Sequence, residues 1–154
     1  MKPKIIKSNQ LNITGITGDG SKTGDVWNEF ERKYTAAPFD KAEDCAYEIR
    51  FWDGDKHVTK GKDVHIGFAT DDNVDGFTTV VLPEADYAVF DVYVAKGYEN
   101  SNEEMDKWLA DNSSKYDQLM LDGIDFVIEC YNEKFKGGDQ PDSIVEMWIP
   151  ICEK

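Results

Sequence analysis

Glu129 is the residue whose surroundings most clearly indicate chemistry. It lies in an apolar segment, residues 125–132, two positions before Tyr131. A carboxylate there must be paired or face a cavity, because an isolated charge in an apolar environment is costly. Among tyrosine and tryptophan rings such a group suits an organic cation, through Coulomb attraction and a cation–π contact worth about 0.5–2 kcal/mol. Exposure of Glu129 on the solvent side of an alternating strand is the alternative interpretation.

A second glutamate, Glu48, lies in the similar segment 45–52. Because side chains alternate along a strand, Glu48 shares its side with Arg50, so an ion pair is at least as well supported as a ligand role. Six residues are predicted to line a ligand cleft: Glu129, Tyr131, Tyr47, Trp148, Trp108 and Phe51. For Trp108 the competing interpretation is a place in the core, since aromatic residues on the apolar face of a helix are usually buried there.

Other site chemistries find little support in the sequence. His57 and His65 are the only histidines, at no metal-ligating spacing, and no Cys-x-x-Cys motif occurs. Residues 71–76 resemble the start of a calcium loop, but Leu82 stands where the bidentate glutamate belongs, which favours an acidic turn. Residues 15–23 lack the adjacent Gly-Lys of a phosphate loop. We therefore expect no cofactor and no metal ion.

Composition narrows the classes of partner. The 154 residues include 31 acidic and 17 basic side chains, a formal net charge of −14. This charge disfavours nucleic acid and anionic membrane surfaces, which bind through lysine and arginine. The three cysteines are an odd number without short spacing, which predicts reduced thiols and a cytoplasmic location. No segment has the roughly 20 apolar residues that span a bilayer.

The hydrophobic pattern predicts the elements that must position these residues. Two helices are expected, at 25–34 and at 102–112, the second with Ser101 as N-cap and Glu104 completing a capping box. Seven strands are expected, at 11–16, 45–52, 64–70, 77–82, 87–95, 125–132 and 143–151. Residues 53–55 read as a turn and residues 71–76 as a linker.

The two halves of the chain repeat at a fixed offset. Three pairs of like residues lie 81 positions apart: Trp27 and Trp108, Glu48 and Glu129, Val64 and Val145. The opening strands align only loosely. We expect a single α+β domain over 1–154, built from duplicated βαββ units at about 1–72 and 76–154. Two helices would pack on an antiparallel sheet with pseudo-twofold symmetry, leaving a central cleft near the axis.

Several segments resemble one known family when taken together, in this order: 26–30, 46–48, 77–90, 107–109, 125–133 and 145–151. The strand, Leu-Pro turn and Tyr-Ala-Val-Phe strand of 77–90 and the closing Ile-Pro-Ile of 149–151 are typical of GyrI-like effector-binding domains. These domains occur alone or fused to AraC-type and MerR-type regulators. The resemblance implies two βαββ units and an aromatic pocket whose buried glutamate, here Glu129, meets cationic ligands.

The resemblance implies an effector-binding protein for a hydrophobic, cationic or neutral small molecule. The sequence departs from the fused regulators because it has no helix-turn-helix segment, so we expect no DNA-binding domain in it. A protein partner, either a regulator or a gyrase-like enzyme, stays open. Two other functions also stay open. A hydrolase acting on electrophilic small molecules would use Glu129 as acid or base, with Tyr131 beside it. A protein-interaction inhibitor of the gyrase-inhibitor type would act through its acidic surface. Ligand binding without turnover is the preferred prediction.

Overall fold

The computed structural model describes residues 1–52 and 61–154, so His57 and the turn expected at 53–55 lie outside the described residues. The helices are α1 (Thr23–Ala36) and α2 (Glu99–Asp111), each preceded by a single 3-10 turn, η1 (Gly20–Lys22) and η3 (Val94–Lys96). The strands are β1 (Lys4–Ser8), β2 (Leu11–Gly18), β3 (Ala46–Trp52), β4 (Val64–Ala69), β5 (Thr78–Leu82), β6 (Ala85–Tyr93), β7 (Tyr116–Gln118), β8 (Met120–Leu121), β9 (Ile124–Tyr131) and β10 (Ile144–Glu153).

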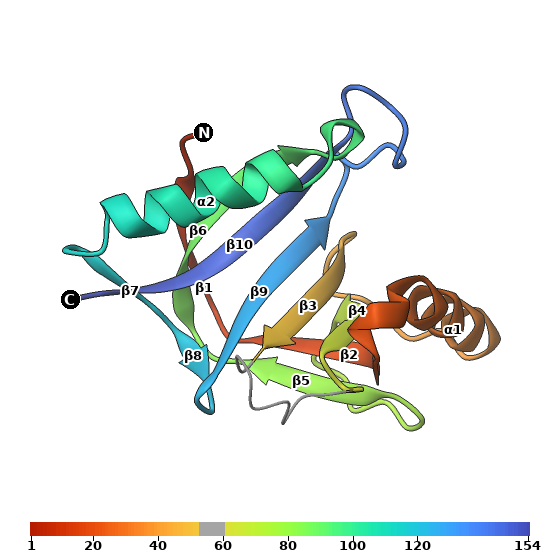
Figure 1. Cartoon of the computed structure of the whole chain (residues 1–154). Helices are drawn as coiled ribbons and strands as arrows, with labels where there is room; N and C mark the ends of the chain where they lie inside the picture. The colour runs from red at the N-terminus through yellow and green to blue at the C-terminus, as the bar shows by residue number, and fades with distance from the viewer. Residues whose placement is uncertain (53–60) are drawn as a thin grey trace.

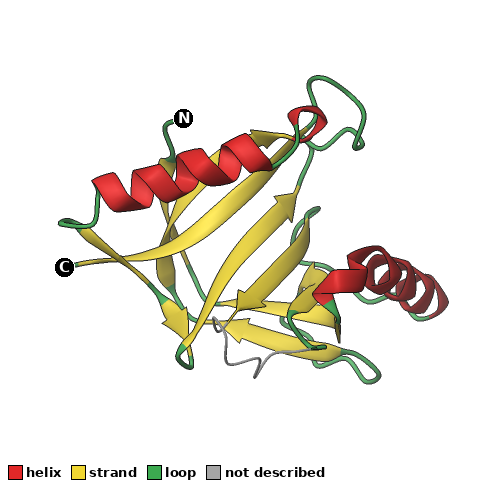
Figure 2. Cartoon of the chain, viewed as in Figure 1, coloured by secondary structure: helices red, strands yellow, loops and turns green. Residues whose placement is uncertain are grey.

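All strands belong to one curled antiparallel sheet, with the two helices packed on it (Figures 1 and 2). The strand order is β1-β6-β10-β9-β3-β4-β2-β5, with β7 beside β10 and β8 beside β9. Strands β3 and β9, one from each half of the chain, pair at the centre. The predicted α+β fold of duplicated βαββ units is confirmed, and it puts the two glutamate-bearing strands side by side.

The pairing register shows the duplication directly. Glu48 lies opposite Ile66, and 81 positions later Glu129 lies opposite Met147. The opening strands follow a different offset: Ile13 pairs with Val80, and the equivalent pair is Tyr87 with Ile6 (87 − 13 = 74; 80 − 6 = 74). Between equivalent positions, the chain from β6 to α2 is therefore seven residues longer than the chain from β2 to α1 (81 − 74 = 7). This difference explains why the opening strands aligned loosely in the sequence.

The outer strands are exchanged between the halves. Strand β1 precedes β2 in the chain but pairs with β6, and β5 precedes β6 but pairs with β2. The first strand of each half of the chain therefore pairs with a strand of the other half: β1 extends the sheet beside β6, and β5 extends it beside β2.

Side-chain alternation gives the sheet two covered faces. On the face away from the helices, which we call the inner face, the sheet curls around a core that includes Tyr47, Ile49 and Phe126. On the helix face, Val26 and Phe30 of α1 pack on β4, while α2 packs on β6 and β10. The residues of this second helix cluster are Ala88, Phe90, Val92, Met105, Met147, Ile149 and Ile151. The helices therefore flank the centre of the sheet, where β3 and β9 run between them.

The start of α2 differs from the prediction. The helix begins at Glu99 with Tyr98 at the N-cap position and no side-chain cap, so the capping box of Ser101 and Glu104 is wrong. The chain arrives through η3 and Gly97, whose positive φ of 77° turns the backbone directly into the helix. The early start brings Tyr98 into the region of the candidate site.

Candidate functional site

Two buried carboxyl groups meet at the centre of the helix face. Glu48 on β3 and Glu129 on β9 are direct partners in the antiparallel register. Their exposed fractions are 2% and 7%. Opposed side chains in such a pair have Cβ atoms roughly 5 Å apart, so two negative charges there need a counter-charge or a proton.

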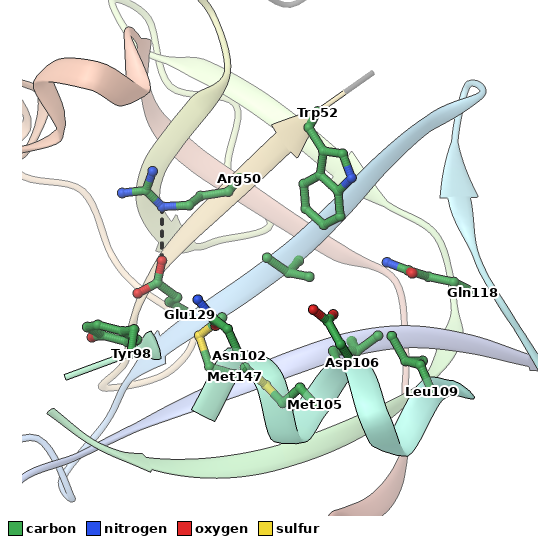
Figure 3. Close-up of a pocket in the computed structure, with 12 residues that line it drawn as sticks. Arg50, Trp52, Tyr98, Asn102, Met105, Asp106, Leu109, Gln118, Glu129 and Met147 are labelled. Carbon is green, nitrogen blue, oxygen red and sulfur yellow. Dashed lines mark hydrogen bonds and ion pairs between the residues drawn. The ribbon is translucent and has the colours of Figure 1, made fainter. Parts of the chain in front are cut away.

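Arg50 supplies the counter-charge to both glutamates. Its Nε donates to Glu48 Oε2 at 2.8 Å and to Glu129 Oε2 at 3.1 Å. Its Nη2 donates to Thr23 Oγ1, at the start of α1, at 2.8 Å. Figure 3 shows the guanidinium beside the Glu129 carboxyl at one end of a cavity.

Glu48 is the charged member of the pair. Burial works to raise its pKa, but hydrogen bonds from Glu129 and Trp27 and the charge of Arg50 lower it overall. The indole Nε1 of Trp27 donates to Glu48 Oε1 at 2.7 Å. Both oxygens of Glu48 are therefore held by donors from α1 and β3, which makes this carboxylate part of the framework.

The pKa of Glu129 is shifted in the opposite direction. Burial, followed by the hydrogen bond and charge of Glu48, raises its pKa to about 8, although Arg50 works to lower it. Glu129 therefore holds a proton more tightly than an ordinary glutamate does. The Tyr131 hydroxyl, whose pKa is raised by burial and then by Glu129, lies 3.4 Å from Glu129 Oε1 and donates to it.

Glu129 opens onto a cavity of about 540 Å³ beneath α2. Most of its wall is apolar, from Met105, Leu109, Val127, Met147 and Ile149; the other lining residues are Arg50, Trp52, Tyr98, Asn102, Asp106, Gln118 and Glu129. No α1 residue is among them. In Figure 3 the Asp106 carboxylate, on α2, is directed into the same space, away from the Glu129 end.

The six residues predicted to line the cleft are divided between two faces. Glu129 lines the cavity, and Tyr131 lies behind it, its ring 5.1 Å from that of Trp27. Trp108 packs in the α2 core, stacked 5.8 Å from Tyr116. Tyr47, Phe51 and Trp148 belong to the inner-face core, on the other side of the sheet from Glu129. The structure therefore does not bring these three to the cavity.

Tyr47 and Trp148 instead border a second hollow of about 270 Å³, together with the buried thiols of Cys45 and Cys130. The Tyr47 hydroxyl donates to Glu43 at 2.8 Å, and the Trp148 indole donates to Glu146 at 3.1 Å. Both polar groups are thus satisfied by neighbouring carboxylates, as buried tyrosine and tryptophan require.

Sequence reasoning missed several lining residues of α2. Tyr98, Asn102, Met105, Asp106 and Leu109 follow the spacing i, i+4, i+7, i+8 and i+11, which is one face of a helix. From the sequence, this spacing could have indicated that the five residues share one face of the helix. Because this face mixes polar and apolar residues, its spacing alone does not distinguish the wall of a cavity from the solvent boundary of a helix.

The described residues contain neither a metal-binding cluster nor a membrane-spanning helix. Within residues 1–52 and 61–154, no group of three or more histidine, cysteine, aspartate or glutamate side chains is arranged to hold a metal ion. Neither α1 nor α2, the two α-helices of these residues, is long and apolar enough to cross a membrane.

Comparison with known proteins adds three findings. Residues 4–151 match the sequence profile of a family described as integron-associated effector binding protein. The structure of SAV2435 bound to tetraphenylphosphonium is similar, with a TM-score of 0.70 and 14% identity, covering 99% of this chain and 94% of that one. The search of curated protein sequences found no match.

Two other solved structures share the fold. EcmrR in complex with DNA has a TM-score of 0.70 and 15% identity over 99% of this chain, but only 57% of the EcmrR chain is covered. An integron cassette protein of Vibrio cholerae has a TM-score of 0.51 and 16% identity, covering 99% and 97% of the two chains. At these identities the likeness concerns the fold.

Proposed function

Since the chain belongs to the integron-associated effector-binding protein family, we propose that its cavity binds a bulky hydrophobic organic cation and that Glu129 is the anionic partner. One observation carries the proposal: a buried, ionisable carboxyl group opens onto a cavity whose wall is otherwise mostly apolar. An apolar pocket with a few convergent polar groups is the usual form of a small-molecule site.

The size and charge of the cavity favour this class of ligand. A volume of about 540 Å³ lies within the range of roughly 300–1,000 Å³ that holds drug-sized molecules. A cation would replace the proton on Glu129, and the thioether and aliphatic groups would contact its apolar body. Asp106 adds a second carboxylate to the wall, which favours a positive over a negative ligand.

The comparisons support the proposal by analogy. SAV2435 shares the fold and was solved with tetraphenylphosphonium, a bulky hydrophobic cation. EcmrR carries the same fold within a longer DNA-bound chain. We infer that occupancy of the cavity here is passed to a protein partner. Such a signal requires the ligand to bind two states of the protein with different affinity.

A calorimetric titration with two ligands of similar shape tests the proposal. Methyltriphenylphosphonium is the cation, and triphenylphosphine oxide is its neutral counterpart. Wild-type protein should bind the cation more tightly at pH 9 than at pH 6.5. Glu129→Gln should weaken the cation at pH 9 by at least tenfold, about 1.4 kcal/mol, and leave the neutral ligand unchanged.

Glu146→Gln is the matched control, because Glu146 is a buried carboxylate with 7% exposure on the neighbouring strand β10, facing the second hollow. It should bind the cation as wild type does. Equal cation affinity in the wild type and in Glu129→Gln would reject the cavity assignment.

Hydrolysis of an electrophilic small molecule is a second candidate, favoured by one observation. A carboxyl group with a pKa near 8, with a tyrosine hydroxyl 3.4 Å away, has the properties of a general acid. Turnover of an epoxide or ester that stops in Glu129→Gln would support this function. Binding without turnover would support the effector-binding role.

A further inference from the structure

Arg50 occupies a place in the cavity wall that a cation-binding site would not be expected to contain. Among the lining residues that the structure describes it is the only cationic one, and its Nε lies 3.1 Å from the carboxyl group proposed to bind the ligand. Before any ligand arrives, Glu129 already has a positively charged partner.

The contacts of Arg50 are unequal. Its bonds to Glu48 and Thr23, both 2.8 Å, connect it to β3 and α1, whereas the bond to Glu129 is longer. If Arg50 releases Glu129, two hydrogen bonds still hold it. Glu129 then keeps the Tyr131 hydroxyl, its hydrogen bond with Glu48 and any group that a ligand in the cavity brings to it. The arrangement favours exchange at Glu129 and retention at Glu48.

We propose that Arg50 is a resident cation that a ligand must displace from Glu129, and that it thereby restricts the cavity to cations whose apolar bodies fill it. This proposal rests on the proposed function, and in it Arg50 is the residue that makes the cavity specific for bulky cations.

The physical reason is that the ligand binds the ionised form of Glu129, and a positive group already lies against that form once the proton has left. Exchanging a guanidinium for a ligand cation at the same carboxylate gains little Coulomb energy, and the incoming ion loses its hydration. The net gain must then come from apolar surface placed against Met105, Leu109, Val127, Met147 and Ile149. A small ammonium ion has little such surface and does not compete with Arg50.

Removing Arg50 should allow small cations to bind at Glu129. The groups that face Glu129 are Glu48 and Arg50 from β3, Tyr131 from β9 and Tyr98 from the start of α2, with Asp106 elsewhere on the cavity wall. Without Arg50, the two glutamates share one proton at neutral pH and keep one negative charge. A small cation would then find an unpaired charge.

The test measures the affinity of three ligands for Arg50→Met, Arg50→Lys and Arg32→Met at pH 7.5. Tetramethylammonium is the small cation, methyltriphenylphosphonium the bulky one and triphenylphosphine oxide the neutral one. Arg32 is the chain's other arginine and is exposed on α1, so Arg32→Met removes the same charge far from the cavity. Arg50→Met should bind tetramethylammonium at least tenfold more tightly than wild type. Arg50→Lys and Arg32→Met should stay within threefold of wild type, and the neutral ligand should not distinguish the proteins.

A second measurement needs no substitution. With only two arginines, the Nε–Hε signals in arginine-labelled wild-type protein are readily assigned by nuclear magnetic resonance. The bulky cation should shift the Arg50 signal and leave that of Arg32 in place, while the neutral ligand, which does not displace Arg50 from Glu129, should shift the Arg50 signal less.

The outcomes separate this inference from the proposed function. If wild type binds the bulky cation through Glu129 but Arg50→Met binds cations equally or more weakly, Arg50 positions Glu129 and the inference is overturned. An unshifted Arg50 signal at saturation overturns it as well, even if Arg50→Met does not fold. Failure of wild type to bind the bulky cation overturns both proposals.

Discussion

The two repeat-equivalent glutamates, one in each half of the molecule, have different surroundings. Glu48 and Glu129 are equivalent by the repeat and lie opposite each other on one sheet. In the first half, the indole of Trp27 on α1 donates a hydrogen bond to Glu48. Glu48 is therefore the closed glutamate, whose carboxylate is fully held by neighbouring side chains. In the second half, the equivalent Trp108 packs against Phe90 and Tyr116, and Glu129 remains open to a cavity. A duplication thus provided two equivalent carboxyl groups, of which one supports the fold and the other is available to a ligand.

The seven additional residues between equivalent positions of β6 and α2 distinguish the second half from the first. Most of them lengthen α2 at its start: α1 begins at Thr23, whose repeat equivalent is Glu104 (23 + 81 = 104), whereas α2 begins at Glu99. The added helical residues and Tyr98 before them contribute to the wall of the cavity beside Glu129. The repeat mates Arg50 and Tyr131 (131 − 50 = 81) add to the asymmetry, since a charged group follows one glutamate and a neutral hydroxyl follows the other.

The largest expected effect concerns the closed glutamate. Glu48→Ala should lower the free energy of unfolding by about 3 kcal/mol, because it leaves Arg50 and the Trp27 indole without their buried acceptor. Glu129→Ala should lower it by less than about 1 kcal/mol, because its place opens onto a cavity. Urea denaturation at pH 7.5 measures both. Equal losses of unfolding free energy would contradict the view that Glu48 supports the fold and Glu129 does not.

Trp27 and Trp108 provide the next comparison. Trp27→Phe should cost about 2 kcal/mol of unfolding free energy, since a buried carboxylate loses a hydrogen bond. Trp108→Phe, which keeps an aromatic ring against Tyr116, should cost about 1 kcal/mol or less. Thermal unfolding of the two variants compares them, and a larger loss from Trp108→Phe would contradict the assignment.

The pH dependence of binding reports on the open glutamate. Because the pKa of Glu129 is raised to about 8, a cation that needs the ionised form should bind roughly tenfold more weakly for each pH unit below 8, and affinity should level off above it. A neutral ligand should show no such slope. Calorimetry from pH 6 to 9 measures both, and a flat profile for the cation would contradict an exchange of proton for ligand.

The same shift predicts a trend in stability. The folded protein holds the proton of Glu129 more tightly than the unfolded chain does. This contribution to stability is complete below about pH 4.5 and is lost as the pH rises through about 8. Glu129→Gln should remove that part of the pH dependence, which unfolding measurements at several pH values can show.

The smallest effect is expected at Asp106. It is exposed and lines the cavity on α2, so water screens its charge. Asp106→Asn should weaken the bulky cation about twofold to fivefold at pH 9, much less than Glu129→Gln. A loss as large as that of Glu129→Gln would move the main anionic contact from β9 to α2.

Much of the fold follows from the sequence because the signals are strong and repeated. Alternation along residues 45–52 and 125–132 placed Glu48 with Arg50 and Glu129 with Tyr131, and the 81-residue offset identified the two glutamates as equivalent. Short outer strands such as β1, with the sequence Lys-Ile-Ile-Lys-Ser, were not predicted. They are held by partners far away in the chain, so their own pattern is weak.

The candidate site was harder to predict for a specific reason. Both faces of the central strands are covered, so both carry apolar and aromatic residues, and period-two alternation cannot tell which face holds the cavity. Tyr47, Phe51 and Trp148 were therefore placed on the cleft, although they face the inner core. The polar residues of α2 that line the cavity depend on how far the helix stands from the sheet, which no local pattern encodes.

The exchange of outer strands has a consequence for folding and evolution. A polypeptide cut at the acidic segment 71–76 would give two fragments, each lacking the strand that covers its own sheet border. Neither piece would be expected to form a finished structure alone, but the two should reassemble when mixed. Because each repeat pairs with a strand that precedes the other, we expect the two repeats, and with them Glu48 and Glu129, to unfold together.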